Sequence, residues 1–214
     1  MKETYVKSGF PAEKIFVAYS DIDTEKFDIP KKDRETDDSF KALYVSHTSP
    51  LKGLHYLLEA WSQLKIKNRK LTIVGDFKVP EKLRQKYLNI IDKDKTIQWV
   101  GYDKDVAKYY KRASIFVFPS LTEGNPKVVM EAMASGLPVI TTDNAQSIVK
   151  DGESGFVVPI RDSEAIKEKI EFLYNNPDIR ETMGRKARRA VENKKNFGEA
   201  VYEIYQEICK REGI

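Results

Sequence analysis

Two glutamates, Glu123 and Glu131, have seven residues between them and are the side chains best suited to hold a ligand. A carboxylate accepts hydrogen bonds, so two of them at one site can hold the hydroxyls of a sugar or a ribose. Between them the sequence predicts the start of a helix, whose unpaired backbone N–H groups suit a phosphate. Together these groups indicate a ligand that carries both hydroxyls and phosphate.

A strand–loop–helix–strand unit is predicted to position these glutamates. The apolar, β-branched run Ser114–Ser120 ends in a polar turn, and Asn125 is expected to cap a helix with Pro126 in its first position. A second β-like run, Leu137–Thr141, follows the helix directly. Because open α/β sheets bind ligands at the carboxyl ends of their strands, the loop around Glu123 is a candidate binding loop.

A second candidate lies earlier in the chain, where a predicted strand ends and a helix begins. Lys52 and Gly53 stand at this junction, and a cation there can meet phosphate oxygens. The two histidines, His47 and His55, have a spacing unlike that of zinc ligands, so we expect no metal site.

The stretch 123–139 resembles the signature of the family 4 glycosyltransferases, which have the GT-B fold. It reads EGNP at positions 123–126 and EAMASGLPV at positions 131–139. The resemblance implies that Glu131 accepts hydrogen bonds from a ribose diol and that Glu123, the catalytic candidate, approaches the transferred sugar. It also implies that the donor loop includes Gly124 and Asn125 and that the amides of Lys127 and Val128 hold the β-phosphate.

The junction at Lys52 and Gly53 resembles the KG pair of the same family, whose lysine binds the donor diphosphate. The family usually has an arginine five residues before this lysine, and this chain has His47. A neutral imidazole supplies one donor, whereas a guanidinium supplies a charged fork. We therefore expect weaker or more pH-dependent diphosphate binding than in the family.

The segment Ile97–Asp103 resembles a family strand whose backbone contacts the nucleotide base. This makes Val100, Gly101 and Tyr102 candidates for base binding, although Tyr102 can equally cover the edge of the core. Near the start, residues 18–27 resemble the element that begins the family's donor domain, and the glycines of residues 151–155 match a structural turn.

The alternation of apolar runs with helix-patterned segments predicts an α/β fold, a Rossmann-like parallel sheet flanked by helices. The resemblance makes it one half of a GT-B glycosyltransferase. The predicted strands are Lys14–Tyr19, Lys41–Ser46, Leu71–Gly75, Ile97–Val100, Ile115–Pro119, Val139–Thr141 and Gly155–Val158. The predicted helices are Gly53–Lys65, Pro80–Ile91, Asp103–Arg112, Pro126–Ser135 and Ala145–Val149, followed by a helical C-terminal tail from Asp162 that is broken near residues 175–177 and 196–198.

The chain is expected to form one domain with two appendages. Residues 1–39 are predicted to be a leader that packs on the domain, with a mobile loop at Pro30–Ser39. Residues 40–196 form the nucleotide-sugar-binding domain. Residues 197–214 form a helix that, by resemblance, crosses to an N-terminal acceptor domain missing from this chain.

The composition agrees with an ordinary globular protein: 214 residues, 41% hydrophobic and 33% charged, with a net charge of +4. The charges are too balanced to indicate nucleic-acid binding. The single cysteine, Cys209, favours a reducing compartment, and we expect a cytoplasmic location. No apolar run reaches the roughly 18 residues of a membrane span, and the first residues lack the apolar centre of a signal peptide.

One basic cluster stands out and has two interpretations. It contains Arg185, Lys186, Arg188 and Arg189. The simpler interpretation is a solvated helix surface, and the alternative is contact with anionic lipid or a phosphorylated lipid substrate at the inner face of a membrane.

Two functions remain open from the sequence. The first, implied by the resemblance, is a hexosyltransferase donor domain that acts with retention of configuration and needs neither metal nor cofactor. It would bind a UDP- or GDP-linked sugar. It would serve glycan or polysaccharide synthesis together with an acceptor-binding domain or subunit. The second is a non-catalytic, degenerate module that binds a partner or regulates one, which His47 favours. A flavodoxin-like protein ranks last because no acidic cluster follows the first strand.

Overall fold

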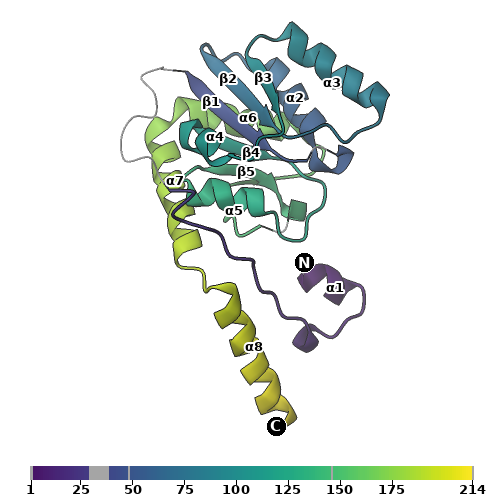
Figure 1. Cartoon of the computed structure of the whole chain (residues 1–214), viewed down its shortest axis with the longest axis vertical. Coiled ribbons are helices and arrows are strands. Elements are labelled where there is room, and N and C mark those ends of the chain that lie inside the picture. The colour runs from purple at the N-terminus through teal and green to yellow at the C-terminus, as the bar shows by residue number, and fades with distance from the viewer. Residues whose placement is uncertain (1, 29–38, 48, 146, 214) are drawn as a thin grey trace.

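A computed structural model describes residues 2–28, 39–47, 49–145 and 147–213. Its centre is a six-stranded parallel sheet in the order β3-β2-β1-β4-β5-β6 (Figure 1). The strands are β1 (Phe40–Val45), β2 (Arg69–Val74), β3 (Ile97–Gly101), β4 (Ile115–Phe118), β5 (Val139–Thr142) and β6 (Gly155–Val158). The helices are α1 (Lys2–Lys7), α2 (Leu54–Gln63), α3 (Glu81–Lys93), α4 (Ala107–Arg112), α5 (Lys127–Ala134), α6 (Ser163–Asn175), α7 (Pro177–Glu192) and α8 (Phe197–Glu212), with short 3-10 turns at Pro50–Lys52, Asp143–Ala145 and Ala12–Lys14.

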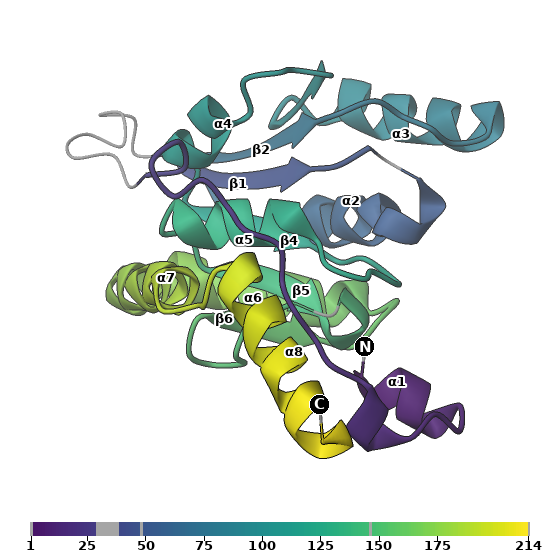
Figure 2. The same cartoon turned by 60° about the horizontal axis from the view of Figure 1, so that its bottom comes forward.

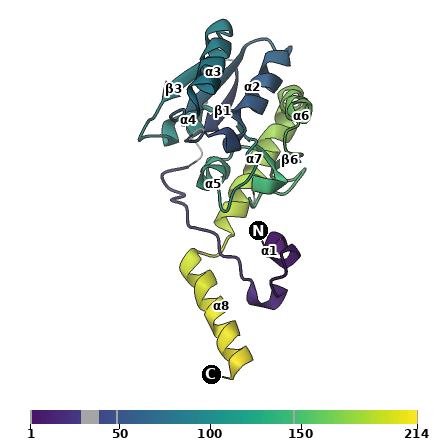
Figure 3. The same ribbon diagram turned by 90° about the vertical axis from the view of Figure 1, so that its right-hand side faces the viewer.

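The sheet is parallel because α2, α3, α4 and α5 each return the chain to the same end of the sheet between successive strands, while β5 and β6 are joined by a connection whose described part holds only a 3-10 turn. The central strand β4 is buried on both faces, so all four of its side chains are apolar. Helices α2 and α6 pack together on one face, and α4 and α5 lie together on the other, with α7 against α5 (Figures 1 and 3). The predicted fold class is therefore confirmed.

Helix α2 shows how the apolar pattern fixes this packing. Leu54, Leu57, Leu58 and Trp61 recur at three- and four-residue steps and are all fully buried against the sheet. The indole of Trp61 donates a hydrogen bond to the Thr96 hydroxyl at 2.9 Å, which satisfies its only polar atom.

The leader and α8 extend together from the domain (Figure 2). Lys194 Nζ donates to the Tyr19 carbonyl at 3.0 Å, and the Phe197 amide donates to Asp21 Oδ1 at 2.8 Å. Further along, Arg211 Nη1 donates to the Glu13 carbonyl at 2.8 Å. This part of the leader thus lies along α8, whereas Phe27 reaches the core of the domain.

Three predictions of secondary structure were wrong. The apolar run Lys14–Tyr19 forms no strand, because it lies beside α8 and not at an edge of the sheet. Of the helix predicted at Ala145–Val149, Ala145 ends a short 3-10 turn that begins at Asp143, and the described residues 147–149 are not helical. The helix predicted from Asp103 begins at Ala107, because the Asp103 side chain accepts from the Asp105 amide and closes a turn there.

The loop predicted at Pro30–Ser39 falls, except for Ser39, outside the described residues. Both breaks predicted in the helical tail are confirmed, at residue 176 and at residues 193–196. Among the helices that the structure describes, none has the length and hydropathy needed to cross a bilayer.

Candidate functional site

The site lies where the chain changes direction across the sheet. From β1 the chain moves outward through β2 to β3, and from β4 it moves the other way through β5 to β6. Strands β1 and β4 are neighbours, with Ala42 opposite Ile115 and Leu43 opposite Phe116. The connections that follow these two strands therefore start side by side and lead to helices on opposite faces of the sheet. Open α/β sheets bind ligands at this kind of position.

The loops after β1 and β4 are bonded to each other and bring two predicted residues together. Lys52 Nζ forms an ion pair with Glu123 Oε1 across 71 positions of sequence. The Leu121 amide donates to the Leu51 carbonyl at 2.7 Å, which holds the loops in register. Gly53 allows this approach: its φ is +69°, and a Cβ there would lie 1.9 Å from the Pro119 carbonyl oxygen.

Glu131 projects from α5 and is partly buried. Its Oε2 accepts a hydrogen bond from the Tyr110 hydroxyl at 2.9 Å. Burial raises the pKa of Glu131, although the Tyr110 hydrogen bond and the charges of Lys26 and Lys127 act in the opposite direction. Burial also raises the pKa of Tyr110 well above its ordinary value, so Tyr110 stays a donor.

A cavity of about 180 Å³ lies beside this carboxylate, at the ends of β1 and β2. It contains four of the predicted site residues, namely His47, Tyr102, Val128 and Glu131. Sequence reasoning missed the other lining residues, which are Val45, Ser46, Val74, Gly75, Asp103 and Val106. The position of Ser46 and Gly75 as the last residues of predicted strands was a signal that could have identified them.

Rings and charges at this cavity suit a flat, polar ligand. The rings of His47 and Tyr102 are within 10° of parallel, with centroids 6.2 Å apart. Asp103 is bonded to Lys108 and Tyr109, each at 2.7 Å from Oδ2. The hydrogen bonds from Lys108, Tyr109 and the Asp105 amide lower the pKa of Asp103 to about 2, so this carboxylate is ionised at neutral pH.

The remaining predicted residues do not line this cavity. Gly101 ends β3 with a φ of +79°, and Lys127 is the first residue of α5. The amides of Lys127 and Val128 stand in the first helical turn, where backbone N–H groups lack intrahelical acceptors. Gly124 lies in the loop between β4 and α5.

The prediction that Asn125 caps α5 was wrong. The N-cap position is held by Pro126, with no side-chain cap. The Asn125 side chain instead donates to Ser20 Oγ in the leader at 3.0 Å. A contact across 105 positions of sequence competes here with the local capping bond, and no local pattern predicts it.

The basic cluster of α7 is not one uniform surface. Arg188 is largely buried, with 14% of its side chain exposed, and donates to the carbonyls of Thr24, Phe27 and Ala134. It thereby attaches the leader to the domain and is unsuited to a lipid headgroup. Arg185 is exposed and pairs with Glu181.

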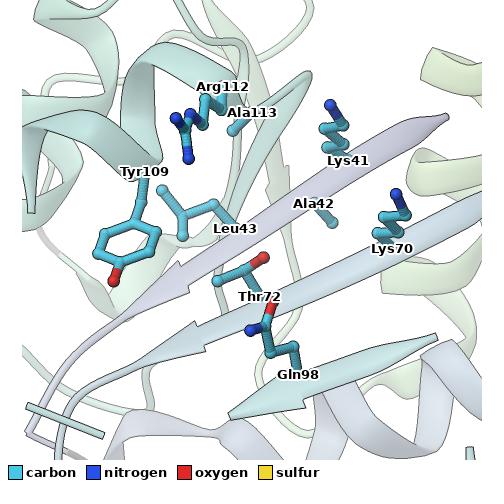
Figure 4. Close-up of a pocket in the computed structure, with 9 residues that line it drawn as sticks. All are labelled: Lys41, Ala42, Leu43, Lys70, Thr72, Gln98, Tyr109, Arg112 and Ala113. Carbon is cyan, nitrogen blue, oxygen red and sulfur yellow. The ribbon is translucent and has the colours of Figure 1, made fainter. Parts of the chain in front are cut away.

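A second cavity, of about 200 Å³, lies over the face of β1–β3 near α4. Leu43, Thr72 and Gln98 line it from three adjacent strands, and Tyr109 and Arg112 reach it from α4 (Figure 4). None of the predicted site residues lines it. Within the described residues, no group of three or more His, Cys, Asp or Glu side chains could hold a metal ion.

The fold is one half of a GT-B glycosyltransferase. The chain is similar to Anabaena Alr3699/HepE in complex with UDP-glucose, with a TM-score of 0.81 and 20% identity, covering 98% of this chain and 61% of that one. It is also similar to the C-terminal domain of the group 1 glycosyl transferase LpcC from Francisella tularensis, with a TM-score of 0.70 and 22% identity, covering 82% of this chain and 98% of that domain.

The family follows from the sequence comparison. The model of glycosyl transferases group 1 matches residues 25–190, so the chain belongs to this family. It is 32% identical over 189 residues to the capsular polysaccharide biosynthesis glycosyltransferase CapM of Staphylococcus aureus, covering 84% of this chain and 50% of CapM. It is 33% identical over 156 residues to an uncharacterized glycosyltransferase of Haemophilus influenzae, covering 71% of this chain and 44% of that protein. The chain thus spans about half the length of the curated relatives it matches.

Proposed function

We propose that this chain is the donor-binding half of a family 4 glycosyltransferase that transfers a hexose from a nucleotide diphosphate with retention of configuration. The observation that carries the proposal is that Lys52 pairs with Glu123 where the loops after β1 and β4 meet, while Glu131 borders the cavity at the ends of β1 and β2. A cation, two carboxylates and the N-terminus of α5 match a ligand with two phosphates and two sugar rings.

Each end of the donor has a natural place in this arrangement. The nucleoside occupies the cavity between His47 and Tyr102, backed by Gly101, and its ribose hydroxyls bond to Glu131. The transferred sugar extends along the donor loop of Gly124 and Asn125 towards Glu123.

The diphosphate would lie between Lys52 and the start of α5. An ammonium has three N–H donors, so Lys52 can keep its bond to Glu123 and still bind phosphate oxygens. As the sugar departs, negative charge develops on the β-phosphate, and the amides of Lys127 and Val128 can stabilise it there. Transfer by this route needs no metal and no cofactor besides the nucleotide sugar, and EDTA is expected to leave donor affinity unchanged.

The acceptor would bind to a second domain or subunit that faces this site. Helix α8 carries exposed apolar side chains, among them Val201, Tyr202, Tyr205 and Ile208. Such a face suits burial against the other half of the enzyme. We place the reaction in the cytoplasm, in polysaccharide or glycan synthesis at the inner face of a membrane, where exposed Arg185 and its neighbours Lys186 and Arg189 meet anionic lipid.

Isothermal titration with UDP-glucose, GDP-mannose and ADP-glucose tests donor binding. The chain should bind one of them, and Lys52→Met should weaken binding of the nucleotide sugar by about 10-fold or more, because a charged contact to phosphate is lost. Lys82→Met, at the exposed second residue of α3, is a charge-matched control. Absence of binding at millimolar concentration by the wild type would refute the proposal.

A second candidate function is a degenerate module that binds a partner without catalysis, and it is favoured by His47 at the position of the family arginine. The variant His47→Arg separates the two. A large gain in nucleotide-sugar affinity would support degeneration, whereas unchanged or reduced affinity would support a working site built around the imidazole.

A further inference from the structure

The two glutamates share a feature that their motif does not reveal: each accepts a hydrogen bond from a fully buried hydroxyl. Ser120 Oγ lies 2.8 Å from Glu123 Oε1, and the Tyr110 hydroxyl lies 2.9 Å from Glu131 Oε2. Both hydroxyl residues are 0% exposed, so neither is placed to touch a ligand. A buried hydroxyl is unfavourable unless it is hydrogen-bonded, and here the bond falls on the ligand-binding carboxylates.

We propose that Ser120 and Tyr110 are positioning residues that hold the two glutamates in the orientation needed for the donor. This inference rests on the proposed function, because it assigns Glu123 to the transferred sugar and Glu131 to the ribose. It predicts that each hydroxyl affects the binding of a different part of the donor.

Ser120 is fixed on both sides. Its carbonyl accepts a hydrogen bond from the Thr142 hydroxyl on β5, and its Oγ lies 3.1 Å from the Leu51 carbonyl and 3.2 Å from the Thr122 carbonyl. A serine hydroxyl has a single proton, and the closest and most strongly accepting of these neighbours is the Glu123 carboxylate. The serine therefore orients Glu123 relative to the loop of Lys52.

The bonds to Glu123 use one of its two oxygens. Both Ser120 and Lys52 bond to Oε1, and no hydrogen bond to Oε2 is found within the described part of the chain. A carboxylate held by one oxygen presents the other to a ligand in a fixed direction. Glu131 follows the same scheme, with Oε2 on Tyr110 and the side chain bordering the cavity.

Tyr110 is held by the packing of its ring, whereas Ser120 is held by hydrogen bonds. Its ring packs edge-on against Phe27 at 5.6 Å between centroids and beside Phe116 at 5.5 Å. The hydroxyl reaches both the Val128 carbonyl at 3.2 Å and Glu131 at 2.9 Å. With the ring unable to move, the hydroxyl becomes a fixed point from which the Glu131 side chain is oriented.

The test compares Tyr110→Phe and Ser120→Ala with the wild type by isothermal titration against UDP and UDP-glucose. Each variant removes one oxygen and keeps the packing. The matched controls are Tyr87→Phe, a fully buried tyrosine that does not line the cavity, and Ser135→Ala, a buried serine whose Oγ has no hydrogen-bond partner in the described structure. Thermal unfolding of all variants establishes that each is folded.

Tyr110→Phe should weaken both UDP and UDP-glucose by about 5- to 20-fold, the range expected when one bond that orients a charged group is lost. It should also move the acid limb of the binding profile to higher pH, since the bond from Tyr110 favours the ionised Glu131. Ser120→Ala should weaken UDP-glucose by a similar factor and leave UDP unchanged, because only the sugar contacts Glu123.

The Ser120→Cys variant is nearly isosteric and has a weakly donating thiol, so its affinity for UDP-glucose should lie between those of the wild type and Ser120→Ala. It provides a second measurement if the alanine variant is unstable. Variants that bind both ligands like the wild type, or that lose UDP and UDP-glucose in the same proportion at both positions, would overturn the inference while leaving the proposed function intact. A wild type that binds neither UDP nor UDP-glucose, nor any other nucleotide sugar, would overturn both.

Discussion

Replacing Gly53 by alanine should disrupt the site through backbone contact alone. Gly53 has a φ of +69°, and its Cβ would lie 1.9 Å from the Pro119 carbonyl oxygen and 2.8 Å from the carbonyl carbon. Gly152 provides a matched control, because its φ is +71° and a Cβ added there would meet no atom within 4 Å. Gly152→Ala therefore has the left-handed strain without the clash, and this strain costs about 1–2 kcal/mol.

The difference between the two variants follows from the bonds near Gly53. An ordinary C···O contact is about 3.3 Å, so the loops after β1 and β4 must separate by more than ~1 Å. That movement breaks the Leu121–Leu51 hydrogen bond and the Lys52–Glu123 pair, at about 1 kcal/mol each. With the strain included, Gly53→Ala should lose about 3–4 kcal/mol of unfolding free energy.

Thermal unfolding followed by circular dichroism measures this loss. For a chain of this size, about 2–4 °C per kcal/mol predicts a Tm lowered by about 6–16 °C in Gly53→Ala and by about 2–8 °C in Gly152→Ala. Titration with UDP-glucose should show more than about 10-fold weaker binding only in Gly53→Ala, which displaces Lys52 from Glu123. If both variants unfold at the same temperature and bind alike, the close approach of the two loops does not stabilise the site.

Three further predictions concern charged side chains. Burial raises the pKa of Glu131, so the stability conferred by its proton is present below the unfolded pKa and lost as the pH rises through the folded pKa. In urea unfolding, Glu131→Gln should therefore be more stable than the wild type at pH 7 but not at pH 4. Its affinity for the donor should fall by about 10- to 100-fold. Asp103 should titrate near 2 by carbon-13 NMR, with its stabilising contribution present above the unfolded pKa and lost as the pH falls through 2, and Lys108→Met should raise that midpoint. Arg188→Met should lose at least about 2 kcal/mol of unfolding free energy and expose the leader to trypsin, because three backbone carbonyls lose their donor. Arg185→Met breaks only an exposed i,i+4 pair, so its unfolding free energy should stay within about 0.5 kcal/mol of the wild type.

The elements of the sheet could be predicted because their signals are local. The strand Ile115–Phe118 is apolar at every position, and α2 repeats its leucines at helical spacing, so burial and periodicity agree. The run Lys14–Tyr19 has the same apolar character, yet it forms no strand. A strand requires a neighbour with unpaired backbone groups, and local sequence cannot show that this run lies beside α8.

The site was predictable in its residue types but not in its bonds. The spacing of Glu123 and Glu131 and the position of Lys52 after a strand are visible in the sequence. The partners are not: Lys52 and Glu123 are 71 positions apart, and Asn125 bonds to Ser20 across 105. Local propensity assigned Asn125 to the helix cap, but a side-chain amide can bond to whichever partner the fold brings near, and here the leader supplies one.

This difference explains why the supporting residues are harder to find than the residues proposed to bind the ligand. A carboxylate that meets a ligand stands in a loop or at a helix start, where its polarity contrasts with the apolar pattern around it. Ser120 closes an apolar run and Tyr110 lies inside a predicted helix, and both are fully buried. Their hydroxyls acquire a role only because α4 packs beside α5 and the loops after β1 and β4 meet. Residues of this kind are therefore identified by asking which buried polar atom each ligand-binding carboxylate is bonded to, a question that requires the fold.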